Sequence, residues 1–137
     1  MTAARAELAV AKSAALATQA VAVGEYQLLV ARLDGVDGAG LQNAAQGLLD
    51  QLGDGAAVVL GGLPDPSDEG KVILVAAFGK QVIAQGQQAG KFIGSIAKRC
   101  GGGGGGRPNL AQAGGRDGAA LDGVLEAAKV ELKQALG

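Results

Sequence analysis

The sequence predicts an α/β fold, in which a small mixed β-sheet packs with amphipathic helices and an alanine-rich helix comes first. Short apolar runs of strand length alternate along the chain with segments whose apolar residues recur with the period of a helix. Hydrophobic residues make up 48% of the 137 residues and charged residues 18%, a composition that supports a core. The length fits one domain with a short extension. We therefore expect a helical linker over residues 1–23 and a globular domain over residues 24–137.

The first segment, residues 2–22, has the pattern of an alanine-rich helix that ends at Gly24. Small residues from Ala4 to Ala22 recur at alternating spacings of four and three, which places them on one stripe. This stripe suits close packing against a second copy of the chain or another segment, or against the domain that follows. We do not expect a signal peptide, because Glu7 and Lys12 interrupt the apolar stretch.

A strand, a helix and a second strand come next. Residues 26–33 are rich in leucine and valine, which favours a strand. Asp37 follows a turn-forming segment and is a suitable cap for a helix. Apolar residues between Leu41 and Leu52 recur at helical spacing, and Gly53 ends the pattern. The apolar run over residues 56–60 predicts a buried strand, and a loop with two prolines follows it.

Residues 71–78 form the strongest strand candidate. Their apolar run has no alternation, which indicates that both faces of the strand are covered. We expect a loop or short turn over residues 79–86. Apolar residues from Ala89 to Cys100 then predict an amphipathic helix. Cys100 lies on the apolar face, so a thiol packed in the core is a better interpretation than a nucleophile.

Six consecutive glycines occupy residues 101–106, and we expect them to form a loop. Residues 109–113 predict a last short strand. Asp117 begins the final helix, whose apolar face runs from Leu121 to Leu136.

The formal charge of −1 conceals an uneven distribution of charge. Residues 1–70 contain nine acids and three cations, and residues 117–137 contain four acids and two cations. Residues 71–116 contain seven cations and no acid. This basic block predicts a strongly polarised surface.

The basic block and the glycine run together suggest a phosphate-binding surface. Lys91 and Lys98 face away from the apolar stripe of their helix, and Arg99 is adjacent. Glycine allows consecutive backbone N–H groups to converge on one anion. Arg107 and Arg116 bracket the segment that follows the glycines. The alternatives are a solvated helix face and a flexible glycine connector. A nucleotide-binding P-loop is excluded, because no Gly-Lys-Ser/Thr follows the run.

Several residue types are missing or rare. The chain has no histidine and no tryptophan and only one cysteine, which excludes a histidine-based triad, a histidine metal site and a disulfide framework. Three aromatic residues are too few for a base-stacking platform. We expect no catalytic residue, metal or cofactor in this chain. No apolar run has the length of a membrane span, so we expect a cytoplasmic protein.

Three stretches identify a family. GKVILVAAF, AGKFIGSIAKRCGGGGGGRPNLAQAGGRD and LDGVLEAAKVEL resemble the C-terminal domain of alanyl-tRNA synthetase, which is related to the DHH-associated domain of DHH phosphoesterases. The resemblance is strong over residues 70–130 and consistent upstream. It implies a non-catalytic domain that binds the outer corner of tRNA and supports aminoacylation and editing. It also implies tRNA-Ala, the other synthetase domains and a second copy as partners, and places the ATP and zinc sites in other domains.

The predicted tRNA-binding residues come from two sources. The charge pattern contributes Lys91, Lys98 and Arg99. The resemblance contributes Gly101, Gly102, Gly103, Gly104, Gly105, Gly106, Arg107, Asn109, Gln112 and Arg116. Two alternatives remain: a dimerisation or structural module, and a substrate-binding domain of a DHH-type phosphoesterase. The second is disfavoured, because those enzymes typically have a histidine after the glycine motif, where this chain has Arg107 and Pro108.

Overall fold

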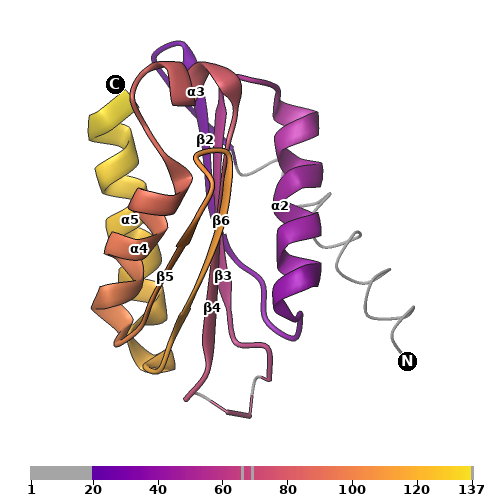
Figure 1. Cartoon of the computed structure of the whole chain (residues 1–137), viewed down its shortest axis with the longest axis vertical. Coiled ribbons are helices and arrows are strands. Elements are labelled where there is room, and N and C mark those ends of the chain that lie inside the picture. The colour runs from indigo at the N-terminus through magenta and orange to yellow at the C-terminus, as the bar shows by residue number, and fades with distance from the viewer. Residues whose placement is uncertain (1–19, 66, 69, 137) are drawn as a thin grey trace.

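A computed structural model describes residues 20–65, 67, 68 and 70–136. A six-stranded sheet lies between one helix, α2, and the pair α4 and α5 (Figure 1). The strands are β1 (Val21–Val23), β2 (Tyr26–Arg32), β3 (Ala56–Gly62), β4 (Val72–Phe78), β5 (Gly103–Gly106) and β6 (Leu110–Gly115). The helices are α2 (Gly38–Leu52), α3 (Lys80–Ala84), α4 (Ala89–Ala97) and α5 (Leu121–Leu136), with short 3₁₀ turns η2 (Lys98–Cys100) and η3 (Gly118–Ala120).

The strand order in the sheet is β1-β2-β3-β4-β6-β5. The β2–β3 pair is parallel and the other four pairs are antiparallel, so the sheet is mixed, as the sequence predicts. Helix α2 connects the parallel pair, because parallel strands need a crossover connection. The short strand β1 lies at one edge and the all-glycine strand β5 lies at the other.

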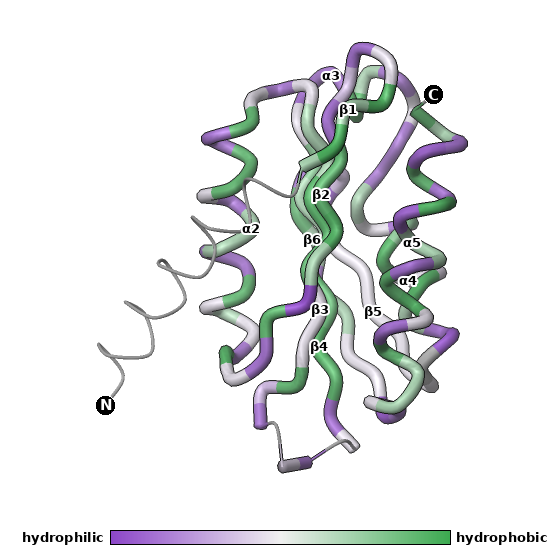
Figure 2. The backbone as a smooth tube through the Cα atoms, turned by 180° about the vertical axis from the view of Figure 1, so that it is seen from behind, coloured by the Kyte–Doolittle hydropathy of each residue, from purple (hydrophilic) through white to green (hydrophobic). Residues whose placement is uncertain are grey.

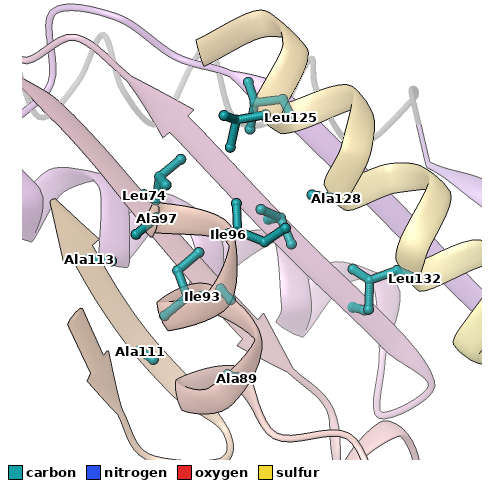
Figure 3. Packing of buried hydrophobic residues seen from close by; sticks show 14 of the residues in the cluster. Leu74, Ala89, Ile93, Ile96, Ala97, Ala111, Ala113, Leu125, Ala128 and Leu132 are labelled. Carbon is teal, nitrogen blue, oxygen red and sulfur yellow. The ribbon is translucent and has the colours of Figure 1, made fainter. Parts of the chain in front are cut away.

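The larger part of the core lies between the sheet and the helices α4 and α5. Figure 3 shows Ile93 and Ile96 of α4 gathered in one cluster with Leu74 of β4 and with Leu125 and Leu132 of α5. All five side chains are buried, and those of Leu74, Ile93 and Ile96 have no solvent exposure. This face accounts for the apolar stripes predicted on both helices.

The opposite face of the sheet packs against α2. Leu41 and Leu48 of the helix are buried against Val58, Leu60 and neighbouring strand residues. The carboxylate of Asp37 accepts the N–H of Gly40 at 2.8 Å, which confirms the predicted cap. Because helices cover both faces, the central strands need apolar side chains at successive positions, which explains their unbroken apolar runs.

Three local predictions are wrong. Val21–Val23 is a strand rather than the end of a helix, because valine favours strands and Gly24, with a φ of 62°, turns the chain back into β2. Residues 80–84 form a short helix instead of a loop. Gly103–Gly106 is a strand, because β6 supplies a partner that the local sequence does not reveal. Residues 1–19, which carry most of the predicted N-terminal helix, and the side chain of Cys100 lie outside what the structure describes.

Candidate nucleic-acid interface

The glycine run is held in the sheet by a hairpin. Strand β5 pairs antiparallel with β6, so that Gly103 lies opposite Gly114 and Gly106 opposite Ala111. The hairpin is closed by the N–H of Arg107, which donates to the carbonyl of Leu110 at 3.0 Å. The glycines therefore have a fixed position instead of forming a flexible connector.

Several of these positions have no room for a larger residue. A Cβ at Gly104 would lie 2.5 Å from the Cα of Ala113 on the neighbouring strand. Helix α4 approaches β5 equally closely, since a Cβ at Gly90 would lie 2.6 Å from the carbonyl oxygen of Gly106, and one at Gly94 would lie 2.9 Å from that of Gly104. Helix and strand thus pack backbone against backbone. This packing explains the glycines better than anion binding does.

The backbone N–H groups of the run do not converge on one anion, contrary to the expectation from sequence. Those of Gly101 and Gly102 donate to the carbonyls of Lys98 and Ala97 at 3.3 and 3.0 Å. Within β5 the N–H groups alternate in direction, as in any antiparallel strand. Since the N–H of Arg107 faces β6, those of Gly103 and Gly105 face it too. By the same alternation the N–H groups of Gly104 and Gly106 face away from β6, so no run of consecutive N–H groups is directed at one anion.

The predicted cations are exposed and fall into two groups at opposite ends of the hairpin. Because Gly90 lies against Gly106, Lys91 lies at the closed end, near Arg107. Lys98 and Arg116 lie at the open end: the N–H of Gly101 donates to the carbonyl of Lys98, and a Cβ at Gly101 would lie 3.9 Å from that of Arg116. The six residues of β6 separate the two ends by about 20 Å at about 3.3 Å per residue. Figure 1 shows the hairpin running between these ends alongside α4.

Arg99 differs from the other predicted cations because it is already paired. Its Nη2 lies 2.6 Å from Oε1 of Glu131 on α5, and both side chains are partly exposed. Within the described residues, no ion pair involves Lys91, Lys98, Arg107 or Arg116. The charges of these four side chains are therefore available to a ligand at the hairpin.

Two predicted polar residues are placed differently. Asn109 is exposed at the tip of the hairpin, and its carbonyl accepts the N–H of Phe78 at 3.0 Å. Gln112 is half-buried on the α2 side of the sheet, where its Oε1 accepts a hydrogen bond from Nε2 of Gln42. Its side chain thus faces away from α4 and Lys91, and it positions α2 on β6.

A depression lies at the open end of the hairpin. It has a volume of about 420 Å³ and is lined by Gly101, Gly102, Gly103, Gly114, Gly115 and Arg116. Gly114 and Gly115 are not among the residues that we predicted from sequence. In the sequence they are the Gly-Gly pair of AQAGG, and nothing local shows that the hairpin brings this pair next to the glycine run.

Other candidate sites are structural. Arg32 bonds to Asp34 and Asp122, and these two carboxylates raise the pKa of its guanidinium. The network joins the end of β2 to the start of α5. No cluster of metal-ligating side chains occurs within residues 20–65, 67, 68 and 70–136. In the same part of the chain, no helix is long and apolar enough to cross a membrane.

The fold and this edge define an α/β domain that presents cations and bare backbone on one side of a sheet. The chain belongs to the DHHA1 domain family, whose model matches residues 25–134. This confirms the family relationship expected from the glycine motif.

Close relatives are named alanine–tRNA ligase. The chain is 96% identical over 137 residues to the one from Prochlorococcus marinus (strain MIT 9313) and 82% identical to the one from Synechococcus sp. (strain CC9311). Each match covers all of this chain but 15% of the relative, so the chain spans about 15% of the length of these curated relatives.

Solved structures agree on the fold. The C-Ala domain of Aquifex aeolicus alanyl-tRNA synthetase matches with a TM-score of 0.68 and 26% sequence identity, covering 85% of this chain and 96% of that chain. A DHH-domain protein described as a member of a family of ribosomal proteins matches with a TM-score of 0.59 and 14% identity, covering 93% of this chain and 31% of the other. At this identity the second match indicates a shared fold alone.

Proposed function

We propose that this chain is a non-catalytic tRNA-binding domain of an alanine–tRNA ligase. The observation that carries the proposal is the acid-free block of residues 71–116. Within the described residues, six of its cations form no ion pair, and four of these lie at the two ends of one exposed hairpin: Lys91, Lys98, Arg107 and Arg116. The similarity to alanine–tRNA ligases and to a C-Ala domain supports tRNA as the nucleic acid. The role of the domain is to hold tRNA at its outer corner while aminoacylation and editing take place elsewhere in the enzyme.

Binding in this mechanism depends on phosphate contacts and on shape. Cations about 20 Å apart bridge separate phosphates of one folded RNA, and the bare strand between them allows the RNA surface to approach closely. With three aromatic residues in the chain, base stacking contributes little. Such binding depends weakly on the base sequence of the RNA, so other parts of the ligase select tRNA-Ala.

The remaining domains of the ligase are the expected protein partners, and the cytoplasm is the expected location. In this proposal the ATP and zinc sites belong to those other domains. For zinc, this chain has no histidine and one cysteine to serve as ligands. This chain itself then binds no cofactor.

A titration of tRNA at several salt concentrations tests the proposal. The logarithm of affinity should fall with the logarithm of salt concentration, with a slope of about 0.7–0.9 per phosphate neutralised. Lys98→Ala with Arg107→Ala removes one cation from each end of the hairpin, and should weaken binding about tenfold and lower the slope by about 1.5. Lys129→Ala with Lys133→Ala on α5 removes equal charge elsewhere and should change binding little.

Two outcomes would contradict the proposal: affinity independent of salt, or equal losses in the two double variants. A nuclease footprint on folded tRNA locates the contact, and protection at the outer corner is expected. Protection confined to single-stranded ends would favour the phosphoesterase alternative.

The two alternatives are less well supported. A substrate-binding domain of a DHH-type phosphoesterase is disfavoured by the relatives, which are ligases, and by Arg107 and Pro108 after the glycine motif. A dimerisation module rests on the alanine-rich segment, most of which lies outside the described residues. Sedimentation at increasing concentration tests it directly, and a second copy is compatible with tRNA binding.

A further inference from the structure

The depression at the open end of the hairpin has a more specific role than the general attraction of its charge. We propose that it is a phosphate subsite in which the Arg116 guanidinium holds one phosphate group of a nucleotide. The assignment of that nucleotide to bound RNA rests on the proposed function, whereas phosphate binding in the depression does not.

The geometry leaves room for such a group. The depression is open to solvent and measures about 420 Å³, which is ample for a phosphate group. Five of its six lining residues are glycines, and a Cβ at Gly103 would meet no atom within 4 Å. The Cβ of Arg116 lies 3.9 Å from the position that a Cβ at Gly101 would occupy, which places the root of the arginine at the rim. A guanidinium binds phosphate through two parallel N–H donors.

The charges around the depression favour an anion. No carboxylate lines it. Asp117 is adjacent in sequence, but its Oδ1 accepts the N–H of Ala120 at 3.3 Å, and Glu131 is held by Arg99. Lys98 lies at the same end, since its carbonyl accepts the N–H of Gly101. Arg116 and Lys98 together outweigh the one carboxylate of Asp117, so the charge at this end of the hairpin favours a phosphate.

Backbone groups contribute little to this subsite. The N–H groups of Gly101 and Gly102 are bonded to carbonyls at the end of α4 and in η2, and that of Gly103 faces β6. Affinity for phosphate should therefore depend on the arginine side chain and on the empty space beside Gly103. Each of these can be changed separately.

A titration with adenosine monophosphate, followed by ¹H–¹⁵N NMR of the chain, tests the subsite without tRNA. The amide signals of residues 101–103 and 114–116 should shift with saturation, while adenosine, which lacks the phosphate, should shift them little. Inorganic phosphate should act at the same signals and separates the phosphate from the nucleoside. Arg116→Gln should weaken binding at least tenfold, and Arg107→Gln, at the other end of the hairpin, less than twofold. Shifts elsewhere, or equal losses in the two variants, would overturn the proposal.

A second pair of variants fills space without changing charge. Gly103→Ala places a methyl group in the depression and should weaken binding of adenosine monophosphate about fivefold. Gly105→Ala is the matched control, because it lies two residues along the same strand and outside the lining. Both should retain the thermal midpoint of the parent chain. Equal affinities for Gly103→Ala and Gly105→Ala would contradict the subsite.

The tRNA titration separates this inference from the proposed function. If the parent chain binds tRNA and Arg116→Gln binds it equally, the assignment of the subsite to bound RNA is wrong and the function stands. If adenosine monophosphate binds in the depression but tRNA does not bind, the function is wrong and the phosphate subsite stands.

Discussion

The centre and the glycine edge of the sheet are built in opposite ways. In β3 and β4 successive side chains are buried on both faces, with Val58 and Leu60 toward α2 and Val59 and Leu74 toward α4 and α5. In β5 there are no side chains, and Figure 2 shows this strand pale between the green centre and α4. Burial of apolar area stabilises the centre, whereas close backbone packing stabilises the edge. Helix α4 covers part of β5 at Gly104 and Gly106, and the remaining surface of this exposed strand is open to a ligand.

The centre should tolerate loss of side-chain volume poorly. Leu74→Ala removes a fully buried side chain between the sheet, α4 and α5 and leaves a cavity. We expect the free energy of unfolding to fall by about 3 kcal/mol, measured by urea denaturation. A loss below about 1 kcal/mol would indicate that the helices collapse onto the gap.

The edge should tolerate added volume poorly. Gly104→Ala places a methyl group 2.5 Å from the Cα of Ala113, so β5 must move away from β6. We expect a loss of about 2 kcal/mol, together with faster amide exchange in β5 and β6. Gly105→Ala is the control, because its nearest contact would be 3.9 Å, and it should change stability by less than about 0.5 kcal/mol. Similar losses in the two variants would indicate that glycine acts through chain flexibility.

A substitution at α2 should lower the stability of the domain without changing its affinity for tRNA. Asp37→Ala removes the carboxylate that caps α2, which covers the centre of the sheet on the face away from α4. We expect the free energy of unfolding to fall by about 1 kcal/mol, with tRNA affinity unchanged. A parallel loss of tRNA affinity in an equilibrium titration would place α2 in the interface.

The smallest effect on stability is expected at the basic edge. Glu131→Gln releases Arg99 from an exposed ion pair, which should cost less than about 1 kcal/mol. The same change removes a negative charge near Lys98, so tRNA affinity should rise about twofold at low salt and approach the parent value at high salt. An unchanged affinity at low salt would place Arg99 outside the tRNA contact.

The elements that the sequence predicted correctly share one property. Residues 41–52 and the apolar run that became β4 have patterns that encode their own faces, so periodicity was sufficient to find α2 and β4. The glycine run has no such pattern, because glycine has no side chain and is compatible with loop or strand. The spacing of residues 4–22 predicts a helix that reaches residue 22, whereas the pairing of Val21–Val23 with β2 depends on the turn at Gly24.

For the candidate site too, local sequence patterns do not reveal how the residues are arranged in space. The acid-free block indicated correctly where the exposed cations lie in the sequence, but it suggested one continuous surface. The structure divides the cations between two ends of a hairpin and pairs Arg99 with Glu131, which is 32 residues away. Gln112 was predicted from the motif, yet it faces α2. No local pattern reports which side of a sheet a polar residue meets.

The sequence by itself determined the family, the apolar elements and the charge of the basic block, because composition, periodicity and motif spacing are local properties. Tertiary structure decided that the glycines form a strand, that the cations separate by about 20 Å, and that a depression opens beside Arg116. These features arise where α4 and β6 approach β5 at backbone distance. That approach depends on the whole packed domain, so no segment read alone specifies it.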